Sequence, residues 1–152
     1  MDNSISNAEF YSGTGGEVDE CSLILRFFGD DLDPEMITAL LGVSATGSQR
    51  KGERKPLMQD TGVWLLQCER TTDVPDNQVK LLLSDLKDDL KIWRQLSDSF
   101  SAEIKCHLFL QRWTRGTIFS VETLAALAAR NLNLHVEVYT PFFPGKSALQ
   151  AP

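Results

Sequence analysis

The most regular feature of this sequence is an alternation of apolar and polar residues in two segments near its end. In segment 103–110 every second residue is apolar, and the residues between include Glu103, Lys105 and His107. Segment 132–139 repeats the same period. Such alternation is typical of strands with one buried and one solvated face. We therefore expect a sheet that is covered on one side only.

Two more segments are predicted to be strands because they are rich in aliphatic, β-branched and aromatic residues. They are 21–28, where Leu23, Leu25 and Phe27 share one face, and 62–69. With the two alternating segments they give four strands, enough for a sheet that can support a core.

Helical spacing of apolar residues predicts a helix directly after the first strand. The Asp33 carboxylate can accept free N–H groups of the first turn, and Pro34 fits the first helical position. Gly42 can adopt the left-handed conformation that often ends a helix. The apolar side of this helix is formed by Met36, Ile37, Leu40 and Leu41.

A longer helical pattern follows Asp76, which is a candidate N-cap. Asp88 and Asp89 could cap a helix of their own, so either one long helix or two helices meeting near Lys87 fit the pattern. In both cases one face is expected to be buried. Its apolar residues are Val79, Leu82, Leu83, Leu86, Leu90 and Trp93.

The last helix is predicted over 121–130, with Ser120 as its N-cap. Its expected buried stripe consists of Val121, Leu124, Leu127 and Ala128. The order of strands and helices predicts an α+β two-layer sandwich, in which helices pack on one face of a mixed or antiparallel sheet. Within this class we expect a ferredoxin-like topology. A fully parallel sheet is disfavoured because its strands would be buried on both faces.

The composition along the chain divides it into three parts. Segment 1–19 is rich in Asn, Ser and Gly, and we expect it to be a flexible N-terminal arm. Segment 20–140 is predicted to form a single α+β domain. Segment 141–152 contains three Pro and one Gly, and we expect a C-terminal tail.

The charge of the chain limits its possible partners, and its apolar runs and cysteines limit its possible location. With 15 Lys and Arg against 21 Asp and Glu, the chain has a net charge of −6, which makes nucleic acid an unfavourable partner. No apolar run is long enough to span a membrane, and no secretion signal is present at the start. The three cysteines lie far apart in apolar segments, which favours reduced thiols and a cytoplasmic location. We expect no cofactor.

Two groups of residues are candidates for binding a partner or an anion. Segment 44–61 is predicted to be a long loop or an edge hairpin, and it carries the cations Arg50, Lys51 and Arg54. It does not match a phosphate-binding loop, because the spacing of its glycines is different. In the second group, Arg112, Trp113 and Arg115 place an indole between two guanidinium groups, a composition that is enriched at interfaces. The alternative explanation for the first group is a solvated loop. For the second group it is packing of Trp113 over the edge of the sheet.

Two other groups contain residue types that occur in chemical sites. His107 and His135 both have the outward phase of their strands, and Glu103 and Glu137 are the nearest outward carboxylates. One of these carboxylates could complete an acid–base or metal site with the two histidines. Packed or solvated histidines are the simpler interpretation. The three carboxylates at 30–33 could bind a cation, but helix capping and turn formation already explain them. We therefore expect neither a metal nor a catalytic residue.

Several motifs together resemble a known family. They are the run FFGDDLDPEMITALLGVSATGSQRKGE, the Trp64 strand and the run LAALAARNLNLHVEVY. These motifs, over about residues 21–140, are similar to the bacterial domain of unknown function 4279. The resemblance implies a bacterial origin and a small independent domain, and it supplies no catalytic residues. The matching residues that have no structural explanation are those of the loop Arg50, Lys51 and Gly52, and Tyr139.

Three functional hypotheses follow from the sequence. We favour a non-catalytic, cytoplasmic protein-binding module of immunity-like or accessory type, because hydrolase, zincin and thiol-redox motifs are all absent. Its partner would contact the loop at 50–55 together with Trp113 and the neighbouring arginines. The alternative is a small-ligand-binding protein or enzyme with an anion-binding loop at 44–61. A third possibility is a homodimer that forms through a sheet edge.

Overall fold

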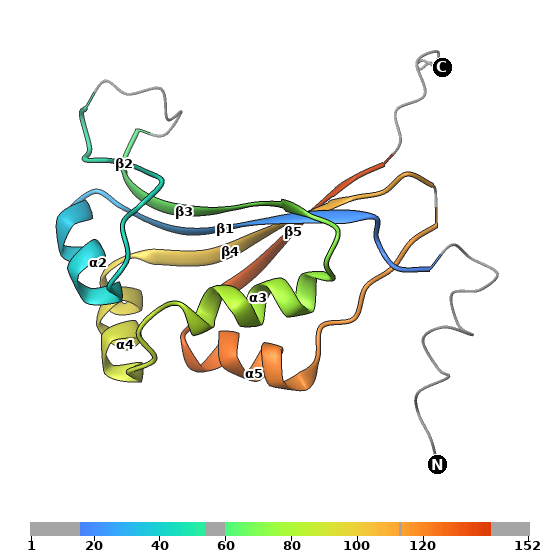
Figure 1. Cartoon of the computed structure of the whole chain (residues 1–152). Coiled ribbons are helices and arrows are strands. Elements are labelled where there is room, and N and C mark those ends of the chain that lie inside the picture. Colours follow the sequence, from blue (N-terminus) through green and yellow to red (C-terminus); the bar gives the residue numbers. More distant parts are fainter. Residues whose placement is uncertain (1–15, 54–59, 113, 141–152) are drawn as a thin grey trace.

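A computed structural model of the chain describes residues 16–53, 60–112 and 114–140 (Figure 1). Of the predicted arm it describes 16–19, and the predicted tail lies beyond the described part. The elements are β1 (Glu20–Gly29), α2 (Pro34–Leu41), β2 (Gly47–Gln49), β3 (Gly62–Thr71), α3 (Pro75–Ser84), α4 (Leu90–Ser99), β4 (Ser101–Phe109), α5 (Val121–Ala129) and β5 (Asn133–Tyr139).

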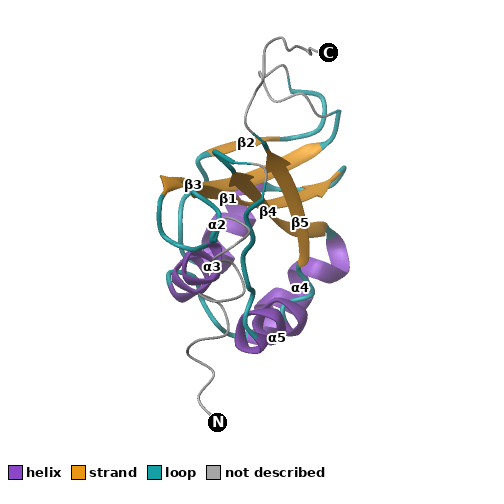
Figure 2. Ribbon diagram, turned by 90° about the vertical axis from the view of Figure 1, so that its right-hand side faces the viewer, coloured by secondary structure: helices purple, strands orange, loops and turns teal. Residues whose placement is uncertain are grey.

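The strands form one five-stranded sheet in the order β2-β3-β1-β4-β5. β1 is central and pairs antiparallel with both β3 and β4. β2 extends the sheet antiparallel to β3, and β5 extends the other side parallel to β4. Within the described residues, the helices all lie on one side of this sheet, and no helix lies on the other side (Figure 2). We call the side without helices the open face.

This arrangement confirms the predicted α+β two-layer fold with a mixed sheet. The finer expectation of a ferredoxin-like topology stays a prediction, because β5 adds a parallel strand to the antiparallel part of the sheet. The long helical stretch is two helices, α3 and α4. Segment 44–61 contributes β2, which is the edge strand of a hairpin with β3.

Local capping determines where most helices begin. Asp33 accepts from the Glu35 amide at 3.1 Å, and Asp89 accepts from the Lys91 amide at 3.0 Å. Ser120 caps α5 by accepting from the Thr123 amide at 3.2 Å. These three caps are confirmed predictions, whereas the predicted cap of α3 is wrong. The N-cap of α3 is Val74, and Asp76 instead accepts from the Ser120 amide at 2.9 Å.

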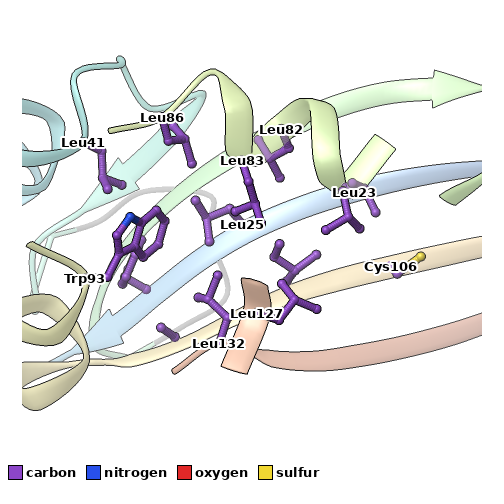
Figure 3. Packing of buried hydrophobic residues seen from close by; sticks show 14 of the residues in the cluster. Leu23, Leu25, Leu41, Leu82, Leu83, Leu86, Trp93, Cys106, Leu127 and Leu132 are labelled. Carbon is purple, nitrogen blue, oxygen red and sulfur yellow. The ribbon is translucent and has the colours of Figure 1, made fainter. Parts of the chain in front are cut away.

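The core lies between the covered face of the sheet and the helices (Figure 3). β1 contributes Leu23, Leu25 and Phe27, each fully buried, as their shared phase predicts. Two buried tryptophans keep their indole N–H groups paired, as buried polar groups require. Trp64 donates to the Thr38 hydroxyl at 3.0 Å, and Trp93 donates to the Lys87 carbonyl at 2.8 Å.

The cysteines face this core as free thiols. Burial raises the pKa of Cys21 to about 11 and that of Cys106 to about 12. Burial also raises the pKa of Cys68, with a contribution from the Asp85 carboxylate. All three are therefore protonated near neutral pH, which makes them poor nucleophiles.

The predicted buried stripe of α5 is largely wrong. Leu127 is buried, but Val121 is 75% exposed and Leu124 is 45% exposed, and Ala128 is exposed as well. The helix is apolar almost all round, so the spacing alone could not identify its buried side. Thr123, which sequence reasoning did not choose, is buried in their place.

Two other differences concern the limits of elements. Leu90 is predicted on the buried face, but it is 45% exposed because it begins α4 after the break in the helical stretch. Val18, within the segment predicted to be an arm, is buried and donates its amide to the Gly116 carbonyl at 2.9 Å. The folded part of the chain thus begins before Asp19.

Candidate functional site on the open face of the sheet

Polar side chains of β1, β4 and β5 meet on the open face, which has no helix above it. The parallel register places Lys105 beside His135 and His107 beside Glu137. The antiparallel register places Arg26 beside Glu103. The expectation that both histidines and both glutamates point outward on one face is confirmed by these pairings.

Glu137 is the centre of one set of contacts. Its carboxylate accepts from the Tyr139 hydroxyl at 2.6 Å and pairs with the Lys105 ammonium at 3.0 Å. His107 Nε2 lies 3.4 Å from the same carboxylate, while His107 Nδ1 lies 3.2 Å from the Ser22 hydroxyl. These contacts fix five side chains from three strands relative to one another.

Glu103 is the centre of a second set of contacts. Its carboxylate accepts from the Arg26 guanidinium, with Arg26 Nε at 2.8 Å, and His135 Nδ1 lies 3.4 Å from it. The side chains of Arg26 and Glu103 are each only 19% exposed although they point away from the helices. Mutual packing of charged side chains therefore shields them from water.

The contacts around Glu137 alter three ionisation equilibria. The hydrogen bond from Tyr139, together with Lys105, lowers the pKa of Glu137 to about 2. The same hydrogen bond raises the pKa of Tyr139. Burial, followed by the positive charge of Lys105, lowers the pKa of His107. At neutral pH this set therefore contains a carboxylate, an ammonium, a neutral phenol and a largely neutral imidazole.

An aromatic stack lies at one end of the open face. The Arg70 guanidinium lies 3.7 Å from the centre of the Phe109 ring. The Phe109 and Tyr139 rings are stacked with centres 5.1 Å apart, and His107 meets Tyr139 edge-on at 5.6 Å. We call Arg70, Phe109 and Tyr139 the aromatic stack. Arg70 and Tyr139 are exposed, and Arg70 also pairs with the Glu20 carboxylate, so the stack presents a ring and a paired cation to solvent.

Sequence reasoning did not find the aromatic stack. Its members come from β3, β4 and β5, so their proximity depends on a strand order that the sequence does not state. One signal is present in the sequence: Phe109 and Tyr139 both have the outward phase at the ends of alternating segments. Tyr139 is also one of the family-like residues without a structural explanation.

Arg50 and Lys51 lie in the loop after β2, which we call the basic loop. It is held by acidic residues of the turn between β1 and α2 and of the first turn of α2. Arg50 pairs with Glu35, and with Asp33 at 3.0 Å, while Lys51 pairs with Asp30 at 2.8 Å. Hydrogen bonds from Lys51 and Thr61 lower the pKa of Asp30. These pairs are exposed, and such pairs stabilise a fold only slightly. They do, however, offset the positive charge that is predicted to attract a partner.

The second predicted group lies after β4. Arg115 is largely buried and pairs with Asp19 at 3.2 Å, and Asp19 also accepts from the Gln111 amide at 2.6 Å. Arg115 thus attaches this segment to the start of β1. Arg112 is exposed near the aromatic stack, since Leu110 donates its amide to the Tyr139 carbonyl.

The two predicted groups do not form one surface. The basic loop lies at the Gly29 end of β1, and Arg112 and Arg115 lie at its Glu20 end, on opposite ends of the sheet (Figure 1). The whole length of β1 lies between them. Because a strand rises about 3.3 Å per residue, this length amounts to about 30 Å. Two further predicted residues, Arg54 and Trp113, are not among those the structure describes.

The histidines are also remote from the basic loop. β2 and β5 are the two edges of the sheet, with three strands between them. Neighbouring strands lie about 4.8 Å apart, so the two edges are separated by roughly 19 Å. The enzyme alternative, in which Arg50 and Lys51 bind an anion and His107 or His135 serves as the acid–base group of the same site, has no support from this geometry.

The contacts of Ser22, His107 and Glu137 resemble a hydrolytic triad only in their residue types. Acyl transfer also needs N–H donors for the developing oxyanion. Ser22 lies in the central strand opposite His107 of β4, at the irregularity in the ladder to β3, and it is only 8% exposed. Among the described residues, no group of three His, Cys, Asp or Glu side chains is placed to hold a metal ion.

The comparison with protein families identifies the chain. The model of the family described as Domain of unknown function (DUF4279) matches residues 19–141. The chain belongs to this family. The DUF4279 match covers every strand and helix of the fold, from β1 to β5. Neither the curated proteins nor the solved structures contain a significant match. Within the described ranges, no helix has the length and apolar content needed to cross a bilayer.

Proposed function

We propose that this DUF4279 domain is a non-catalytic binding module that recognises a protein partner through the aromatic stack, with Arg112 at the rim. The observation that supports this proposal most is the exposed Arg70–Phe109–Tyr139 stack on a sheet face without helices. Arginine and tyrosine are enriched among the residues that dominate protein interfaces, and a stacked ring costs little further ordering on binding.

The rings, rather than the cations, support this choice of end. Arg50 and Lys51 of the basic loop pair with carboxylates of this chain, and Arg70 of the stack pairs with Glu20 in the same way, but only the stack adds an exposed aromatic ring. The net charge of −6 favours the approach of a basic protein. A cytoplasmic location, a bacterial origin and an immunity-like or accessory role are parts of this proposal, and the three free thiols support the location.

A random peptide library displayed on phage and selected on the immobilised full chain would test the proposal. Selected peptides are then synthesised and titrated against the wild type and Tyr139→Ala by calorimetry. Loss of an interface residue of this kind is expected to weaken binding about tenfold or more, which corresponds to about 1.4 kcal/mol. Arg70→Ala should have a similar effect.

Lys51→Ala is the matched control, because it removes a cation at the other end of the sheet and should leave the affinity unchanged. The proposal is wrong if no peptide is selected, or if the selected peptides bind Tyr139→Ala as tightly as the wild type. Circular dichroism of each variant verifies that the fold is intact.

A further inference from the structure

The two edges of the sheet differ in how well they are protected from pairing with another strand. The β2 edge is only three residues long, and short edge strands resist further pairing. The β5 edge is seven residues long, from Asn133 to Tyr139, and contains no Pro, Lys or Gly. A regular edge strand without these residues leaves a row of backbone N–H and C=O groups available for another strand.

Apolar side chains continue from the β5 edge along its helix side. Val136 and Val138 have the same register as the buried Cys106 and Leu108, yet they are 41% and 54% exposed. They point toward the helix layer, but α5 does not cover them. Valines on the core side of a strand are usually buried, so this exposure indicates a surface that lacks a partner.

The exposed stripe of α5 lies on the same flank of the molecule. The flank of α5 that faces α3 lines a groove through Glu122 and Ala126. At 100° per residue, Leu124 and Ala128 lie on the opposite flank, away from α3 and next to the β5 edge. With the highly exposed Val121 they form an apolar stripe on that flank of α5.

We propose that a second copy of this chain covers this surface, with β5 pairing antiparallel to β5 of the partner and α5 packing against α5 of the partner. The two sheets would then form one continuous sheet. A two-fold axis at Val136 places Val136 opposite itself and Leu134 opposite Val138 on the helix side. On the open face it places His135 opposite Glu137, so an imidazole meets a carboxylate twice.

Neighbouring registers lack this complementarity. An axis at Glu137 would place two carboxylates opposite each other, and an axis at His135 would place two imidazoles opposite each other. The charged face of β5 therefore favours the axis at Val136, while the apolar face pairs apolar side chains in this register as well, and this self-complementarity supports a second copy as the occupant.

Sedimentation velocity of the full chain over a concentration series tests this proposal. The wild type is expected to have twice the 17.0 kDa mass of one chain. Val136→Lys places a charge in the centre of the pairing strand, and Leu124→Arg places one in the α5 stripe. Each variant should shift the population to the monomer while keeping the circular dichroism spectrum of a folded chain.

Leu81→Lys is the control, because Leu81 is 56% exposed on α3, which packs beneath β1 rather than at the β5 edge. This variant should remain dimeric. A monomeric wild type at all concentrations would overturn the proposal and leave the edge to another occupant, such as an extended segment of a different protein. A dimer that persists in both Val136→Lys and Leu124→Arg would also overturn it, since another surface would then hold the copies together.

Discussion

The two faces of the sheet use the same strands for different purposes, and β1 shows this most clearly. Leu25 and Phe27 point to the helices and are fully buried, whereas Arg26 and Phe28 point to the open face and are half-buried. On the covered face, apolar burial stabilises the fold. On the open face, charges and rings hold one another in fixed positions. A strand can therefore tolerate changes on one face that would unfold the protein on the other.

Adjacent phenylalanines of β1 provide the strongest test of this comparison. Phe27→Ala should reduce the free energy of unfolding by about 3–5 kcal/mol, because the ring fills space between Trp64 and Trp93. Phe28→Ala should cost about 1 kcal/mol, since its ring mainly lies under the Arg26 guanidinium. Urea unfolding measures both. Equal losses for the two variants would contradict the division between the faces.

Two arginine pairs allow a finer test. Arg26→Met removes the partner of the Glu103 carboxylate, whose side chain is only 19% exposed. We expect this change to lower the free energy of unfolding by about 1 kcal/mol, because the carboxylate loses its hydrogen bonds. Arg50→Met removes an exposed pair, so we expect less than half of that loss. If thermal and urea unfolding show a larger loss of stability for Arg50→Met than for Arg26→Met, then the ion pair on the open face does not stabilise the fold more than the ion pair of the basic loop.

The smallest of these effects is expected in the dependence of stability on pH at acid pH. The folded chain holds the pKa of Glu137 at about 2 instead of 4.5, so its contribution is complete above pH 4.5 and is lost as the pH falls toward 2. Glu137→Gln should therefore show a shallower loss of stability in this window than the wild type. Urea unfolding at several pH values measures the slopes, and Glu69→Gln, on β3, is the control. Identical slopes for wild type and Glu137→Gln would contradict the assigned contacts.

Much of the fold could be predicted because neighbouring residues determine it. The alternation in segment 103–110, the cap Asp33 with Pro34, and the break near Lys87 all depend on a few adjacent positions. α5 could not be oriented in this way, because a helix with apolar residues on most sides gives no preferred face. Its buried side depends on packing against the sheet and α3.

The candidate site could be predicted only in part, for the same physical reason. The outward phases of His107 and Glu137 follow from one strand each, and they are correct. That these two residues are neighbours depends on β5 pairing parallel to β4, which neither segment encodes alone. The pairing of Lys51 with Asp30 likewise joins residues 21 positions apart and removes the reason for treating the loop as a free cationic patch.

The central position of β1 also affects how the chain can fold during synthesis. Leu23 is made early, but its neighbours across the sheet, Cys68 and Cys106, are made much later. Contacts between residues so distant in sequence slow folding, because long loops must close before the contacts form. The edge of this apolar strand that pairs with β4 therefore stays without a partner while the ribosome completes most of the domain, and in that period it would be a binding site for chaperones.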